Sequence, residues 1–180
     1  MLFADVTGFT RLVESVEPEI VYEVVRGLMD ELVTVVHRHG GNVQQVLGDG
    51  FMAVFGLRSG ACDAADRALR AGSALVTMGR GHPPVHAGVE YGEVLVTPGW
   101  ESADFGVWGR PVNLAKRLCD LAGPGQIQVG PAAFAQAGRR VDGAVPVDVR
   151  LKGITSPVVA YQVIPDAALP VRGAPALRCR

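Results

Sequence analysis

Two aspartates stand where the chain is predicted to leave or reverse a β-strand. Asp5 ends the apolar run of residues 1–4, and Asp49 lies at the tip of a predicted hairpin. Each aspartate alone is more typical of a turn residue or a cap. Together they are more informative: if the first strand lies beside the hairpin, both carboxylates reach one edge of the sheet. Such a pair is suited to hold two divalent ions about 3.5–4 Å apart.

The residues after Asp5 have the composition of a phosphate-binding turn. The first strand is connected to a predicted helix by Val6, Thr7, Gly8, Phe9 and Thr10. Backbone N–H groups that precede and open a helix point toward an anion, so this turn is suited to cradle a phosphate while Asp5 holds a metal ion.

A second polar group lies on a later predicted helix. Asn113 and Arg117 are four residues apart, so both side chains project from one helix face, while Lys116 points elsewhere. A solvated polar face is the common alternative. An asparagine and an arginine are also suitable donors for a ribose oxygen and a triphosphate during phosphoryl transfer. Lys152 is a further candidate phosphate contact, although a lysine at a strand edge is an ordinary feature.

These residues are positioned by alternating strands and helices. The sequence predicts helices over residues 18–39, 61–78, 111–121 and 131–137. It predicts hairpins that join residues 42–47 to 51–55 and 84–90 to 93–97, a short strand over 126–129, and edge strands over 145–151 and 158–164. This order favours an α+β fold, a ferredoxin-like sandwich in which helices pack on an antiparallel or mixed sheet.

Length and composition limit the function classes. The 180 residues predict one domain over 1–164, with a truncated first strand, and a flexible tail over 165–180. A formal charge of −1 argues against a bulk nucleic-acid binder. We expect a cytoplasmic protein, because no apolar stretch approaches the about 18 residues of a membrane span and no signal peptide opens the chain. The GxSxG, P-loop and GxGxxG motifs are missing.

Four segments together resemble the catalytic domain of the class III nucleotide cyclases. They occur in the order and at the separations of that family, and the resemblance extends over roughly residues 1–164. The segments are residues 3–10 (FADVTGFT), 47–56 (LGDGFMAVFG), 107–118 (VWGRPVNLAKRL) and 151–153 (LKG).

The resemblance implies a homodimer with head-to-tail subunits and shared active sites. In that arrangement Asp5, the Val6 carbonyl and Asp49 of one subunit hold two Mg²⁺ or Mn²⁺ ions. From the other subunit, Asn113 orients the ribose and Arg117 stabilises the transition-state phosphate.

The resemblance also implies the reaction. The turn over residues 7–10 binds the β- and γ-phosphates, and Lys152 is a candidate phosphate contact. The metals activate the ribose 3′-hydroxyl for in-line attack on the α-phosphate, which yields a 3′,5′-cyclic nucleotide and pyrophosphate for intracellular signalling. We expect ATP to be the substrate and cyclic AMP the product of this lyase.

Two positions depart from the family pattern for base recognition. The adenine-reading lysine, three residues before the Gly-Asp of the hairpin, is Gln45 here, and its usual partner position is Gly106. Gln45 still offers a hydrogen bond to a base edge, but Gly106 offers only its backbone. Asp104 substitutes for Gly106 if the loop is shifted. The two departures predict weaker activity.

Two other functions stay open. The first is a catalytically weak or inactive cyclase-like module that binds a metal-nucleotide or a partner and acts as a regulator, which Gln45, Gly106 and the short first strand favour. The second is a palm-like enzyme that makes or breaks another phosphodiester. Its acidic Gly-Gly-Asp-Glu signature is missing from the sequence.

Overall fold

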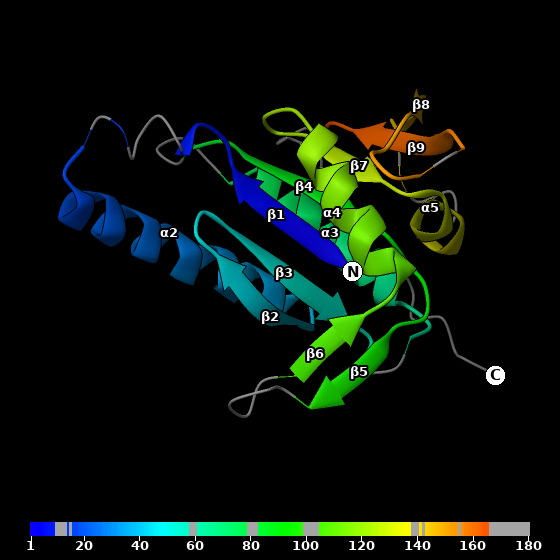
Figure 1. Ribbon diagram of the computed structural model, residues 1–180, viewed down its shortest axis with the longest axis horizontal. Coiled ribbons are helices and arrows are strands. Elements are labelled where there is room, and N and C mark those ends of the chain that lie inside the picture. Colours follow the sequence, from blue (N-terminus) through cyan, green and yellow to red (C-terminus); the bar gives the residue numbers. More distant parts are fainter. Residues whose placement is uncertain are drawn as a thin grey trace.

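The computed structural model describes most of the chain (Figure 1). The described residues are 1–9, 14, 16–57, 61–78, 83–98, 105–137, 141, 143–154 and 156–165. Thr10, Asp104 and the predicted tail beyond Pro165 lie outside them.

The first half of the fold is a βαββαβ unit. Its elements are β1 (Leu2–Val6), α2 (Pro18–Arg38), β2 (Gly41–Leu47), β3 (Gly50–Phe55), α3 (Ala64–Val76) and β4 (Val85–Val89). The strands lie in the order β2-β3-β1-β4, and β1 pairs antiparallel with both β3 and β4. This is the ferredoxin-like arrangement, so the predicted fold class is confirmed.

The second half extends the sheet beyond β4. The further elements are β5 (Leu95–Pro98), β6 (Phe105–Trp108), α4 (Arg110–Leu121), β7 (Ile127–Val129), α5 (Pro131–Ala137), β8 (Val145–Val149) and β9 (Val158–Val163). The main sheet continues from β4 through β7 and β9 to β8. It is a mixed sheet, because β4 and β7 run parallel while its other described pairs are antiparallel. β5 and β6 form a separate ribbon (Figure 1).

Two strand predictions are wrong. The predicted hairpin between residues 84–90 and 93–97 does not form, because β4 lies between β1 and β7 while β5 pairs with β6. Both edges of β4 are thus occupied by longer-range partners. The second error concerns residues 158–164: β8 is an edge strand as predicted, but β9 lies between β7 and β8.

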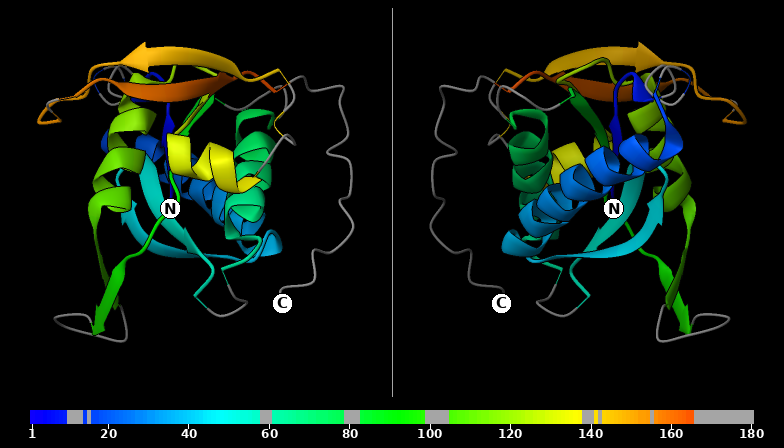
Figure 2. Two further views of the ribbon diagram at one scale, coloured as in Figure 1. Left: turned by 90° about the vertical axis from the view of Figure 1, so that its right-hand side faces the viewer. Right: turned by 90° about the vertical axis from the view of Figure 1, so that its left-hand side faces the viewer.

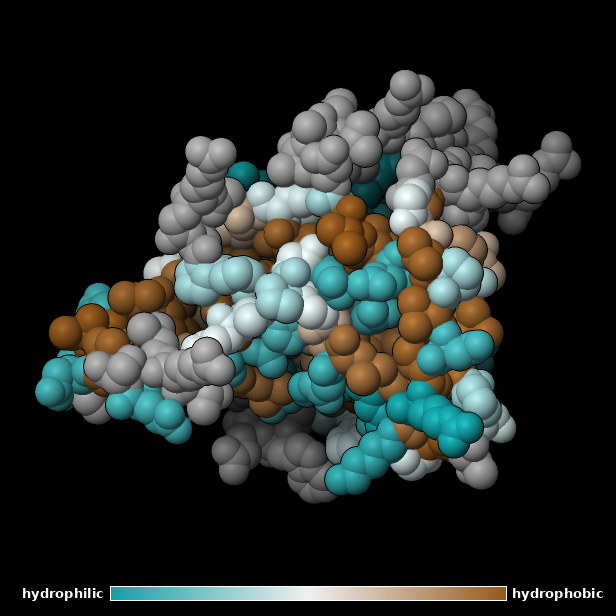
Figure 3. Space-filling model, turned by 90° about the horizontal axis from the view of Figure 1, so that it is seen from above, coloured by the Kyte–Doolittle hydropathy of each residue, from teal (hydrophilic) through white to brown (hydrophobic). Residues whose placement is uncertain are grey.

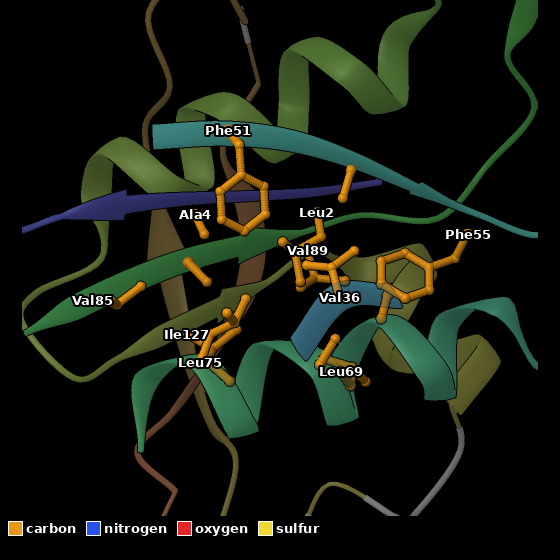
Figure 4. Close-up of a cluster of buried hydrophobic side chains, with 14 of the residues drawn as sticks. Leu2, Ala4, Val36, Phe51, Phe55, Leu69, Leu75, Val85, Val89 and Ile127 are labelled. Carbon is orange, nitrogen blue, oxygen red and sulfur yellow. The ribbon is translucent and has the colours of Figure 1, made fainter. Parts of the chain in front are cut away.

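The larger core lies between the sheet and three helices. Alternate residues of β1, namely Leu2, Ala4 and Val6, belong to this cluster. Figure 2 shows α2, α3 and α5 on this side of the sheet and α4 on the other. Large buried side chains from strands and helices meet in this core (Figure 4), among them Leu2, Val36, Phe51, Leu75, Val85, Val89 and Ile127.

The opposite face of the sheet carries α4. Phe3 of β1 packs there with residues that include Met52, Ala115 and Cys119. Gly88 allows the close approach of this helix, because a Cβ at this position would overlap the backbone nitrogen of Cys119 and the carbonyl oxygen of Ala115. The lack of a side chain at Gly88 therefore determines how closely α4 lies against the strand that neighbours β1.

The surface combines polar regions with exposed apolar side chains. In the first half of α2, Ile20, Tyr22 and Val24 are exposed, and brown atoms mark apolar surface in the view from above (Figure 3). Within the described part of the chain, no helix combines the length and the apolar character that crossing a membrane requires.

Candidate active site

The pairing of strands brings Asp5 and Asp49 together. Asp5 of β1 is the register partner of Gly50 in β3, and Asp49 directly precedes that glycine. The backbone N–H of Val6 donates to the carbonyl oxygen of Asp49 over 3.1 Å. A Cβ on Gly50 would lie 2.7 Å from the Ala4 carbonyl oxygen and 3.2 Å from Asp5 Cγ, so this close approach depends on glycine.

Burial and charge both act on Asp5. The pKa of its carboxyl is raised above the ordinary value, first because burial disfavours the ionised form and second because of the negative charge of Asp49. The charges of His86 and Lys116 act in the opposite direction. A divalent cation would relieve the repulsion between the two carboxylates, and oxygen ligands are the donors that Mg²⁺ and Mn²⁺ prefer.

A change of Asp5 to asparagine is expected to stabilise the metal-free protein at pH 7. A carboxyl whose pKa is raised by folding lowers stability as the pH rises from its unfolded to its folded pKa, and this loss persists at higher pH. Thermal melting of wild type and Asp5→Asn across pH 3 to 8 measures the effect. The variant should melt higher at pH 7, and the difference should shrink below about pH 4. A lower melting temperature at pH 7 would contradict this account of Asp5.

The turn after β1 is held against the start of β4. The Thr7 backbone N–H donates to the Pro84 carbonyl oxygen over 2.7 Å, and Thr7 Oγ1 lies 3.0 Å from His86 Nδ1. Gly8 is exposed and Phe9 is half-buried. A mainly apolar cavity of about 210 Å³ adjoins this turn, and its lining includes Val6, Thr7, Gly8, Phe9, Val24, Val25, Leu28, Asp49 and Pro83.

Helix α4 carries the other candidate group. Asn113 is exposed, whereas Arg117 is half-buried. A Cβ on Gly153 would lie 3.3 Å from Arg117 Nη2, so the Leu-Lys-Gly segment lies against the arginine. Lys152 directly precedes Gly153 in this segment. Leu151 is buried among α4 side chains, which anchors this segment to the helix.

The two base-recognition positions lie on different pairs of strands. Gln45 is exposed on β2, next to a register shift between Val43 and Gln45. Gly106 of β6 is the register partner of Thr97 in β5. A Cβ on Gly106 would lie 2.7 Å from Thr97 Oγ1 and 2.8 Å from Trp108 Nε1, and these two groups are hydrogen-bonded to each other over 3.2 Å. The space that a side chain at Gly106 would occupy is thus filled.

Sequence reasoning missed three residues beside Asp5. His86 is the register partner of Asp5 in β4, and Lys116 forms an ion pair with Asp120 while its charge also acts on Asp5. The Cys119 thiol lies 3.8 Å from the His86 carbonyl oxygen, and burial raises its pKa to about 12, so it is neutral at pH 7. The alternation of side chains along β4 predicts from the sequence that His86 and Gly88 share one face. The sequence pattern does not give the register of β4 with β1, which places His86 opposite Asp5.

Comparison with known proteins identifies relatives. The family model described as the adenylate and guanylate cyclase catalytic domain matches residues 1–163. The chain is 31% identical over 168 residues to uncharacterized protein Rv2212 of Mycobacterium tuberculosis, which covers 89% of this chain and 40% of that protein. It is also 31% identical over 127 residues to uncharacterized protein Rv1319c of the same species. This second match covers 68% of this chain and 24% of that protein. The chain thus spans less than half the length of these curated relatives.

Solved structures give the same result. The guanylyl cyclase Cya2 is 28% identical, with a TM-score of 0.76 over 91% of this chain and 90% of that one. The adenylyl cyclase CyaB of P. aeruginosa is 26% identical, with a TM-score of 0.79 over 92% of each chain. The match to the family model, the mixed sheet and the two similar cyclase structures all agree with the resemblance of the four sequence segments. The chain therefore belongs to the family of adenylate and guanylate cyclase catalytic domains.

Proposed function

We propose that this domain converts a nucleoside triphosphate, with ATP as the expected substrate, to a 3′,5′-cyclic nucleotide and pyrophosphate. The observation that carries the proposal is the placement of two carboxylates, Asp5 on β1 and Asp49 in the turn that precedes its partner strand β3, where the pKa of Asp5 is raised by burial and by the second charge. Such a pair favours binding of divalent cations, which the class III cyclase family uses.

Asp5, the Val6 carbonyl and Asp49 would hold two Mg²⁺ or Mn²⁺ ions. When bound, these ions lower the pKa of the ribose 3′-hydroxyl and offset charge on the phosphates. The half-buried position of Asp5 supports this assignment, because partial exclusion of water strengthens the attraction between the carboxylate and a cation.

Donor chemistry supports the remaining roles that the family resemblance implies. Arg117 presents a guanidinium that can bind the transition-state phosphate at two oxygens, and Asn113 on the same helix orients the ribose. The turn over residues 7–10, of which Thr10 lies outside the described residues, binds the β- and γ-phosphates. Lys152 supplies a further phosphate contact from the segment that lies against Arg117.

We assign the complete site to a head-to-tail homodimer in which the aspartates and the α4 residues come from different subunits. The ribbon of β5 and β6 supports an interface, because it exposes Leu95, Val96 and Trp108 to 63%, 43% and 57%. Large apolar side chains on so small a ribbon favour coverage by a second copy of the chain.

Mixing two inactive variants tests the shared sites. Asp49→Ala removes a metal ligand and Arg117→Ala removes the phosphate donor, so each variant alone should form little product. In a mixed dimer one site receives both substitutions and the other receives neither. Equal amounts should therefore recover about one quarter of the wild-type activity, since half of the dimers are mixed and each has one intact site. No recovery, with mixed dimers shown by native mass spectrometry, would contradict the shared arrangement.

The direct experiment is to measure cyclic nucleotide formation from ATP and from GTP, with Mg²⁺ or Mn²⁺, at high protein concentration. Product from ATP in excess over GTP supports the proposal in full, and product from GTP alone assigns guanylate cyclase activity instead. The second candidate function, a non-catalytic regulator, is favoured by Gln45 and by Gly106, which lacks a side chain for base recognition. A folded dimer that forms neither product would support that candidate.

A further inference from the structure

We propose that His86 is a positioning residue that holds the Thr7 hydroxyl in place to bind the triphosphate of the substrate. The inference deepens the proposed function and rests on it, because it concerns the phosphate-binding turn of the same site. It adds a contact between the turn and β4 that the sequence segments did not indicate.

His86 contacts three parts of the site: β1, the turn that follows it, and α4. The His86 backbone pairs with Asp5 of β1, while its ring nitrogen Nδ1 lies 3.0 Å from Thr7 Oγ1. Its carbonyl oxygen also lies 3.8 Å from the Cys119 thiol of α4. His86 therefore contacts the strand of the candidate metal ligand, the turn that follows it and the helix that carries Arg117.

Among the described residues, backbone hydrogen bonds hold the turn at its beginning. Val6 N–H donates to the Asp49 carbonyl oxygen and Thr7 N–H donates to the Pro84 carbonyl oxygen. The next residue, Gly8, is exposed and has a φ of +83°. The Thr7 side chain lies at the boundary between the anchored strand and the exposed turn, so its bond to His86 restricts the rotamer of the hydroxyl at this point.

The donors and acceptors of the His86 imidazole and the Thr7 hydroxyl determine how their hydrogen bond leaves a donor for a phosphate oxygen. A neutral imidazole has one N–H donor and one acceptor nitrogen, and the contact with the Thr7 hydroxyl is made by Nδ1. Phosphate oxygens accept hydrogen bonds, so Thr7 must keep its own proton for the triphosphate. In the bound state Nδ1 therefore carries the proton and donates to Thr7 Oγ1, and the Thr7 hydroxyl donates to a phosphate oxygen.

The test measures binding of inorganic triphosphate with Mn²⁺ by calorimetry, since this probe isolates phosphate recognition from turnover. Thr7→Val removes the hydroxyl with little change in shape, and His86→Leu removes the ring nitrogens. Each is expected to raise the dissociation constant about tenfold. The double variant should be no weaker than the weaker single variant, because both changes remove the same contact.

Two further variants separate positioning from a structural role. His86→Asn keeps a polar group near the position of Nδ1 and should restore affinity to within about threefold of wild type. Thr34→Val is the matched control: its hydroxyl donates to the Asp30 carbonyl oxygen on α2, and its loss should leave triphosphate affinity unchanged. Melting temperatures show whether each variant is folded.

Clear results would overturn the inference. These are additive effects of the Thr7 and His86 changes, a His86→Asn variant that binds as weakly as His86→Leu, or a folded wild type that binds no triphosphate. Nitrogen NMR of the triphosphate complex formed with diamagnetic Mg²⁺ gives a second test, since an unprotonated Nδ1 contradicts the proposed bond. The proposed function fails separately, when triphosphate binds but no cyclic nucleotide forms from ATP or GTP.

Discussion

The change of Asp49 to alanine is expected to lower cyclic nucleotide formation about a thousandfold. The reason is that a bound metal contributes several kcal/mol to the transition state, and each about 1.4 kcal/mol corresponds to a tenfold change in rate. Asp49 lies in the turn beside Asp5, and its charge is one of the causes that raise the pKa of that carboxyl. Rates at saturating ATP with Mn²⁺ measure the effect, and calorimetry should show that the Mn²⁺ binding heat is lost.

Asp148→Ala provides the matched control for Asp49→Ala. Asp148 is an exposed carboxylate on the edge strand β8, so its removal makes the same change in net charge. We expect this variant to keep the wild-type rate. The Asp49 variant should fold normally, because its loss relieves repulsion with Asp5. An Asp49 variant that binds Mn²⁺ and turns over at the wild-type rate would refute its assignment as a metal ligand.

The change of Gly88 to alanine is expected to lower the free energy of unfolding by about 3 kcal/mol or more, and to reduce activity as well. An added Cβ overlaps backbone atoms of Ala115 and Cys119, so α4 has to move away from β4. Backbone cannot rotate aside as a flexible side chain does. Because Asn113 and Arg117 lie on the same helix, their positions shift with it. Urea unfolding measures the stability and a product assay in native buffer measures the activity.

Gly27→Ala is the control for Gly88→Ala. Gly27 lies inside α2, and apart from the neighbouring backbone of its own helix a Cβ there meets no atom of the described residues within 4 Å. The same substitution should raise the free energy of unfolding by up to about 1 kcal/mol, because alanine is the better helix former. If the two variants unfold at the same urea concentration, α4 does not lie on β4 as described.

The first half of the fold was predictable from local pattern because each signal was strong and consistent with its neighbours. The Gly-Asp-Gly turn fixed the hairpin of β2 and β3, and the apolar periodicity from Ile20 to Val36 fixed α2. Ferredoxin-like topology then placed β1 beside the hairpin. The proximity of Asp5 and Asp49 followed from these elements without knowledge of side-chain packing.

The second half of the fold was less predictable because its strands pair with strands that are distant in the sequence. Tyr91 and Gly92 resemble a hairpin turn, yet β4 is paired on both edges within the main sheet and the next strand pairs with β6. A local turn signal cannot reveal that competition. The position of β9 inside the sheet likewise depends on β7, about thirty residues earlier in the chain.

The contacts of His86 and Lys116 could not be deduced for a different reason. They depend on the register between β1 and β4 and on how closely α4 approaches the sheet. A slip of one residue would reverse the faces of β4 and separate His86 from Thr7. Gly88 controls the second distance, but a glycine in a strand is equally typical of a bulge.

The βαββαβ unit also has a consequence for how the protein is made. Residues 2–89 contain all six of its elements, including both aspartates, whereas Asn113 and Arg117 lie on a helix that follows. Synthesis from the N-terminus therefore delivers the strands around Asp5 and Asp49 from the ribosome before α4. Because α4 rests on Gly88, its docking surface exists only after β4 has joined β1. The order of translation thus matches the order in which the two parts of the site can assemble.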